Sequence, residues 1–172
     1  MIPQIKKILY TTDLSKNSAY AFRYAVDMAQ RHEAKIVILH VIEPIPPHIK
    51  HYVSMYVDEA EWEGKIKKEQ QLTIERIRKR LQEFCKREVQ GNPLCVEQVS
   101  TILVHPGHPV DEILKVVDGE KCDLIILGTH GKGFLLETFL GSVAHSVLDR
   151  SRKPVFIVPL PHGKTDITFE EI

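Results

Sequence analysis

The sequence predicts one α/β domain, built as a single doubly wound, five-stranded parallel sheet with helices on both faces. The first observation is that short runs rich in Ile, Leu and Val alternate with segments whose apolar residues recur every three or four positions. This alternation is typical of βαβ units, which right-handed crossovers assemble into a parallel sheet. The second observation is an almost continuous apolar run, KIVILHVI, at residues 35–42. A strand of this kind is covered by helices on both sides, so we expect it in the middle of the sheet.

Length and composition agree with a single domain. A chain of 172 residues suits one core and has no room for a second full domain. We assign residues 1–160 to the domain and 161–172 to a polar C-terminal tail. Lys plus Arg equals Asp plus Glu at 23 each, so no net charge attracts nucleic acid or an anionic membrane. We therefore expect neither as a partner.

The chain also indicates its compartment. No run reaches the roughly 18 apolar residues of a membrane span, and the N-terminus lacks the apolar core of a signal peptide. The three cysteines are separated in sequence and odd in number, which argues against a disulfide framework. We expect a cytoplasmic protein.

The first half of the chain contains two strands and two helices. Residues 5–10 form a buried strand that ends in a polar loop, and Ser15 or Asn17 caps a helix that runs to about His32. The second strand is residues 35–42.

After the second strand the pattern weakens. Residues 43–62 are interpreted as a long loop with room for a short helix, because Pro44, Pro46 and Pro47 interrupt regular structure at its start. An amphipathic helix follows at residues 66–84, and its basic outer face is interpreted as solvated.

The second half adds three strands and two helices. Gly91-Asn92-Pro93 breaks the preceding helix, and residues 94–104 alternate in the half-exposed pattern of an edge strand. The remaining elements, in order, are a helix from Pro109 to near Gly119, a strand at 123–127, a helix opening at Gly141, and a strand at 154–158.

The segment at residues 128–142 has the composition of a phosphate-binding loop. Gly128 and Gly131 allow backbone N–H groups to approach a phosphate closely. Gly141 and Ser142 lie at a predicted helix N-terminus, where unpaired N–H groups and the helix dipole favour an anion. Ligands of doubly wound sheets bind outside the carboxyl ends of the strands, which is where this loop begins.

The glycine spacing G-x2-G-x9-G-[S/T] resembles the ATP-binding motif of the universal stress proteins. Four further segments resemble the same family in the same order: KKILYTTDLS from Lys6, ILHVIE from Ile38, DLIILGTHG from Asp123 and GSVAHSVLDRSRKPVFIV from Gly141. The resemblance covers residues 6–158. It implies the adenine nucleotide alpha hydrolase-like version of the fold, with ATP as the bound nucleotide and Mg²⁺ bridging its phosphates.

The resemblance also implies roles for particular residues. Asp13 would contact the nucleoside, the main chain of Val41 would meet adenine, and Thr11 would line the same corner. The residues implied to hold ribose and phosphates are Gly128, Gly131, Gly141, Ser142 and Val143, with His130 and Lys132 close by. Family members commonly form homodimers through the last strand, so residues 154–158 would pair with those of a second copy.

Three functions remain open from the sequence. The first is a dimeric, nucleotide-dependent regulatory module of the stress response. The second is a slow ATP-hydrolysing timer that uses His130 or Lys132, although no residue of the chain is assigned a catalytic role. The third is a nucleotide-free dimeric scaffold whose loop at residues 43–62 carries the function.

Other sites fit the sequence less well. A receiver domain needs paired acids after the first strand, and Asp13 has no acidic neighbour. Neither a Walker A loop nor a dinucleotide-binding glycine pattern is present. The histidine pairs His48 with His51 and His105 with His108 are interpreted as surface residues in loops, because neither has a convincing carboxylate partner. No metal site of the protein's own is predicted.

Overall fold

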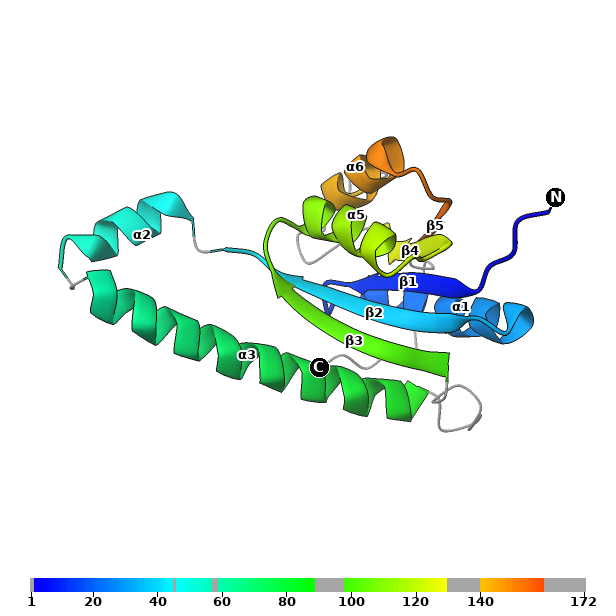
Figure 1. The fold of residues 1–172 in the computed structure, drawn as a ribbon, viewed down its shortest axis with the longest axis horizontal. Helices are drawn as coiled ribbons and strands as arrows, with labels where there is room; N and C mark the ends of the chain where they lie inside the picture. Colours follow the sequence, from blue (N-terminus) through cyan, green and yellow to red (C-terminus); the bar gives the residue numbers. More distant parts are fainter. Residues whose placement is uncertain (1, 45, 57–58, 89–97, 130–139, 160–172) are drawn as a thin grey trace.

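A computed structural model of the chain describes residues 2–44, 46–56, 59–88, 98–129 and 140–159. Five parallel strands form one sheet in the order β3-β2-β1-β4-β5 (Figure 1). The strands are β1 (Lys7–Thr12), β2 (Lys35–Ile42), β3 (Val99–Pro106), β4 (Leu124–Gly128) and β5 (Val155–Val158). The helices are α1 (Lys16–His32), α2 (Pro47–Ser54), α3 (Glu59–Glu88), α5 (Pro109–Gly119) and α6 (Ser142–Arg150).

The predicted doubly wound arrangement is confirmed. Successive residues of β1 point to opposite faces, so Ile8 and Tyr10 pack with α1 and with Leu81 of α3, whereas Leu9 packs with α5 and α6. Figure 1 shows α5 and α6 together on one side of the sheet. The sheet is therefore buried between two helical layers, as the apolar strand sequences require.

The strand order locates the expected ligand position. From β1 the chain moves outward through β2 to β3, then returns to place β4 on the other side of β1 and β5 beyond it. The order thus reverses between β1 and β4, and the carboxyl ends of these strands flank the switch point. β2 lies inside the sheet, as predicted.

The predicted edge position of the third strand is confirmed, but its bounds differ. β3 is Val99–Pro106, and among the described strands it pairs with β2 alone. Residues 94–97, where the predicted strand begins, lie outside the described residues. The polar tail at 161–172 lies outside them as well.

The prediction of a long loop with room for a short helix at residues 43–62 is confirmed for the short helix, which is α2, and wrong for the extent of the loop. α2 begins at Pro47 and α3 begins at Glu59, ahead of the predicted start at residue 66. Proline is well tolerated in the first turn of a helix, because the N–H that it lacks has no intrahelical partner there. The prolines that suggested a break in fact precede and open a helix.

α2 and the first half of α3 extend beyond the sheet (Figure 1). On α2 and the turn after it, Tyr52, Met55 and Tyr56 are 64%, 61% and 75% exposed. The second half of α3 packs on the core through Ile74, Ile77 and the fully buried Leu81. Among the described side chains of α3, those with apolar contacts to the core belong to this half.

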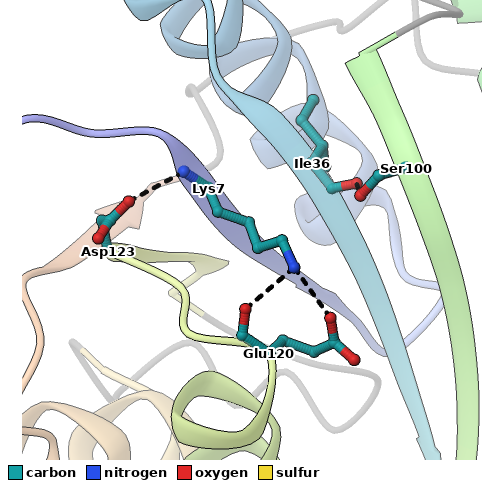
Figure 2. Close-up of polar contacts among 5 residues, drawn as sticks. All are labelled: Lys7, Ile36, Ser100, Glu120 and Asp123. Carbon is teal, nitrogen blue, oxygen red and sulfur yellow. Dashed lines mark hydrogen bonds and ion pairs between the residues drawn. The ribbon is translucent and has the colours of Figure 1, made fainter.

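Polar contacts fix the amino ends of β1 and β4, opposite the switch point (Figure 2). Lys7 Nζ donates hydrogen bonds to the carbonyl and the Oε2 of Glu120, both at 3.0 Å. Asp123 Oδ2 accepts from the backbone N–H groups of Lys6 and Lys7 at 2.8 and 3.0 Å. Ser100 Oγ donates to the Ile36 carbonyl between β3 and β2. The bonds of Lys6 and Lys7 hold β1 against the turn that leads into β4.

The buried Cys122 next to this turn is a free thiol that should resist modification. Burial raises its pKa to about 11, and the charge of Lys7 offsets only part of that effect. Because the thiolate is the reactive form, we expect a Cys85→Ser, Cys95→Ser variant to react with an aromatic disulfide reagent at pH 7.5 at least about a hundredfold more slowly when native than in urea. Labelling at equal rates in both conditions would contradict this expectation.

Candidate functional site

A cavity of about 520 Å³ opens at the carboxyl ends of β1, β2 and β4. It lies at the switch point of the sheet, where doubly wound folds bind ligands. Its walls come from the turn after β1, the end of β2, the start of α5, the end of β4 and the first turn of α6. The lining residues are Thr11, Thr12, Asp13, Ser18, Leu39, Val41, Glu43, Pro109, Ile113, Leu127, Gly128, Thr129, Leu140, Gly141, Ser142, Val143 and Ala144.

Most of the predicted site residues meet at this cavity. Those that line it are Thr11, Asp13, Val41, Gly128, Gly141, Ser142 and Val143. The other three, His130, Gly131 and Lys132, lie outside the described residues. The contacts of each residue with a nucleotide stay predictions.

The turn after β1 holds Asp13 in one orientation. Asp13 Oδ1 accepts a hydrogen bond from the Ser15 N–H at 3.0 Å, and Leu14 between them adopts φ 65°. Ser15 is the N-cap of α1 and forms a capping box with Ser18. Of the two predicted caps, Ser15 is therefore the one used. The carboxylate of Asp13 is fixed at the cavity before any ligand arrives.

Two buried polar contacts hold Thr12, the residue before this turn, in place. His40 Nδ1 lies 2.7 Å from the Thr12 carbonyl oxygen. Because a carbonyl can only accept, Nδ1 carries the proton, and this sets the tautomer of the ring. The hydroxyls of Thr12 and Ser18 lie 2.9 Å apart. β2 and α1 thus both hold Thr12 in place at the cavity wall.

The two ends of the glycine-rich segment meet at the cavity. The Gly141 N–H donates to the Thr129 carbonyl at 2.7 Å, and the Thr129 N–H donates to the Val158 carbonyl at 3.0 Å. This brings Gly128 and Gly141, thirteen positions apart in the sequence, into one wall. These hydrogen bonds explain how glycines at both ends of the motif come to line one cavity.

The structure gives glycine at position 128 a second reason beside the predicted approach of a phosphate. A Cβ there would lie 2.5 Å from Asn17 Oδ1 and 2.8 Å from Asn17 Cγ. Such contacts are far inside van der Waals distance, so the close approach of Asn17 is sufficient to require glycine. The approach of a phosphate to Gly128 stays a prediction.

The first turn of α6 supplies the polarity of an anion site. Gly141 is its N-cap, with φ −65° and ψ 154°, and as a glycine it has no side chain that could cap this end. Ser142 and Val143, at the start of the helix, face the cavity. The first N–H groups of a helix have no intrahelical acceptor and carry the positive end of the dipole. A phosphate at this end of the cavity would accept from them.

The other walls are apolar or acidic. Leu39, Val41 and Ile113 form an apolar surface suited to a flat ring, and Asp13 and Glu43 are the carboxylates among the described lining residues. Glu43 was not predicted as a site residue. Its place two positions after Val41 at the end of β2 is the sequence signal that could have identified it.

The predicted surface histidines need two corrections. His48 and His51 lie on α2 rather than in a loop. His105, at the end of β3, has a carboxylate partner, because its Nδ1 lies 3.0 Å from Glu112 Oε2 of α5. The strand-to-helix turn joins residues seven positions apart, which residue spacing alone does not reveal. Among the residues placed by the structure, no three His, Cys, Asp or Glu side chains gather as a metal site would require.

The chain is similar to proteins of known family. Residues 4–159 match the family described as Universal stress protein family. The universal stress protein MJ0577 of Methanocaldococcus jannaschii is 32% identical over 160 residues, which cover 89% of this chain and 94% of that protein. A protein from Thermus aquaticus described as a universal stress protein is 30% identical over 153 residues, covering 89% of this chain and 98% of its own length.

Solved structures show the same fold. The structure of MJ0577, titled as a structure-based assignment of biochemical function, superposes with a TM-score of 0.64 at 30% identity, covering 94% of this chain and all of that one. A universal stress protein in complex with cAMP superposes with a TM-score of 0.53 at 23% identity, covering 91% of this chain and 98% of that one. Within the described part of the chain, no helix is long and apolar enough to cross a membrane.

Proposed function

Because the chain belongs to the universal stress protein family, we propose that it binds ATP in the cavity at the switch point and acts as a dimeric, nucleotide-dependent regulatory module of the stress response. Mg²⁺ would bridge the phosphates, since this ion is usually held by substrate phosphates together with few protein ligands. The expected cytoplasmic location is part of the same proposal.

The observation that carries the proposal is the combination of walls in one cavity. The helix N-terminus of α6 and the glycine that ends β4 belong to the β4 side of the cavity, the apolar residues of β2 belong to the side across β1, and the fixed carboxylate of Asp13 follows β1 between them. The volume of about 520 Å³ lies within the range of pockets that bind small ligands and cofactors. A nucleotide has the same division, with an anionic end and a flat, weakly polar end.

The separation of polar from apolar walls also supports one orientation of the nucleotide in the cavity. The phosphates would lie against Gly128, Gly141 and the first turn of α6. The base would lie over Val41 and Ile113, and ribose hydroxyls would donate to Asp13. Carboxylates at the phosphate end would repel the ligand, and the described acids Asp13 and Glu43 belong to the turn after β1 and the end of β2 instead.

Calorimetric titration of nucleotide-free protein tests the proposal. We expect micromolar affinity for ATP with Mg²⁺, weaker affinity for cAMP because it presents one phosphate, and chromatography of the incubated mixture to recover ATP. Steady release of ADP would favour the hydrolysing timer. No heat at millimolar ATP would overturn the proposal and leave the nucleotide-free scaffold.

Homodimerisation through β5 has support of its own. β5 pairs with β4 on one side and forms an edge of the described sheet, so its other side presents main-chain groups that a second copy can pair. Aromatic rings lie beside this edge, with Tyr24 of α1 6.0 Å from Phe156 and 5.5 Å from Tyr20 between ring centroids. Tyr24 is 39% exposed, and a partner strand would cover it.

A charge on β5 should therefore separate the dimer. We expect Phe156→Arg to sediment as a monomer at concentrations where the wild-type protein is dimeric, because the added guanidinium would have to be desolvated at the interface. Leu148→Arg is the matched control, since Leu148 lies on α6 and is 51% exposed. Circular dichroism checks that both variants fold, and an unchanged dimer in folded Phe156→Arg would contradict the assignment of the interface.

A further inference from the structure

We propose that Asn17 is a positioning residue for the phosphate end of the cavity. It ties the turn after β4 to the carboxyl end of β5, and through that turn it sets the position of the α6 N-terminus. The inference rests on the proposed function and adds a residue that is not among the described residues lining the cavity.

The side chain of Asn17 joins three elements. Asn17 lies in the first turn of α1 and is only 6% exposed. Its Nδ2 donates to the Val158 carbonyl of β5 at 3.1 Å, and its Oδ1 accepts from Thr129 Oγ1 at 3.2 Å. The donor of the amide is thus used toward β5 and its acceptor toward the turn after β4. An amide is suited to this task, because it presents both groups in one plane.

Thr129 connects Asn17 to the N-terminus of α6 at the cavity. Its N–H donates to the Val158 carbonyl, and its own carbonyl accepts from the Gly141 N–H at 2.7 Å. The Val158 carbonyl therefore receives hydrogen bonds from both Asn17 and Thr129. Gly141 is the N-cap of α6. The helix end proposed to receive phosphate is thus two hydrogen bonds away from Asn17.

Asn17 also determines the residue that can stand beside it. A Cβ on Gly128 would lie 2.5 Å from Asn17 Oδ1 and 3.2 Å from the Asn17 backbone carbon. The side-chain contacts disappear if Asn17 is truncated, and the backbone contact needs a shift of only a few tenths of an ångström. Positions 17 and 128 should therefore behave as a coupled pair.

A general role in stability would have a different signature. A buried amide with satisfied hydrogen bonds stabilises a fold whether or not a ligand binds. Removing it would then lower the melting temperature and leave the relative affinities for ATP and adenosine unchanged. A positioning role instead predicts a selective loss for the ligand that carries phosphates.

The experiment measures ATP with Mg²⁺ and adenosine separately, by calorimetry, on full-length variants. We expect Asn17→Ala to weaken ATP binding about tenfold, the scale of one lost hydrogen bond to a charged group, and to change adenosine affinity by less than about twofold. Thr129→Val should reproduce the selective loss, and Thr129→Ser, which keeps the hydroxyl that bonds Asn17, should restore ATP binding. Because Thr129 itself lines the cavity, Asn17→Ser, which removes the amide and keeps a small polar side chain, is measured in place of Asn17→Ala if that variant does not fold.

The coupled pair supplies the second readout. Gly128→Ala should weaken ATP binding in the wild-type background and add little in the Asn17→Ala background, where the amide that its Cβ meets is gone. A full effect of Gly128→Ala in both backgrounds would show that the phosphate requires the glycine independently of Asn17, and would refute the coupling of positions 17 and 128. Equal losses of ATP and adenosine affinity in folded Asn17→Ala would overturn the inference. Failure of the wild-type protein to bind ATP would instead overturn the proposed function.

Discussion

Gly141→Val should abolish measurable ATP binding while leaving the fold intact. Gly141 is the N-cap of α6 and lines the cavity, so an isopropyl group there would occupy the place where we propose that a phosphate meets the first N–H groups of the helix. Its φ of −65° and ψ of 154° belong to the extended region that valine adopts readily. The backbone needs no rearrangement, so the effect should come from the added bulk.

The expected loss of affinity is at least about a hundredfold, because the side chain would displace the phosphates from several N–H donors at once. The melting temperature of the ligand-free protein should fall by only a few degrees, since replacing a glycine N-cap by an apolar residue costs about 1 kcal/mol or less. ATP should raise the melting temperature of the wild-type protein and have no effect on the variant.

Gly119→Val is the matched control for this measurement. Gly119 is the last residue of α5, next to Glu120 at the opposite end of the sheet, and a Cβ there would meet nothing within 4 Å. The same substitution at this position should leave ATP affinity unchanged. Retained ATP binding in Gly141→Val would remove the phosphate from the α6 N-terminus and with it the proposed direction of binding.

The largest expected effect on stability is that of Leu81→Ala. Leu81 is 1% exposed and packs with the strands of the core from the second half of α3. Removing a fully buried leucine side chain typically costs about 2–5 kcal/mol, because the transfer free energy is lost and a cavity remains. For a chain of this size we expect the melting temperature to fall by roughly 5–15 °C.

Leu72→Ala on the same helix is the control. Leu72 is 44% exposed, so its truncation should change the free energy of unfolding by less than about 0.5 kcal/mol. Urea unfolding monitored by circular dichroism gives both values, and equal m-values would show that the two variants unfold the same structure. A comparable cost at both positions would mean that the first half of α3 also packs against apolar surface, contrary to the arrangement seen here.

Local patterns were sufficient to predict the regular elements of the core. The apolar runs that became β1, β2, β4 and β5 differ from their predicted bounds by no more than two residues. The serine before α1 and the proline that opens α5 marked the starts of those helices. These features depend on neighbours within a few positions, so they can be read directly from the sequence.

The same local reasoning failed where one sequence feature permits two structures. Pro46 and Pro47 suggested a loop, yet proline both ends one element and opens the next, and here it opens α2. Asn17 was considered only as a cap in competition with Ser15. Its actual partners, Thr129 and Val158, lie more than a hundred positions away.

By itself the sequence determined the fold class, the order of the strands along the chain and the glycine motif that led to the cavity, because hydrophobic periodicity and glycine spacing are properties of the linear chain. Only the tertiary structure decided the order of strands within the sheet, the meeting of Gly128 with Gly141, the pairing of His105 with Glu112 and the place of Asn17 between β5 and the turn after β4. These contacts form when distant segments pack, and their geometry depends on that packing rather than on any local preference.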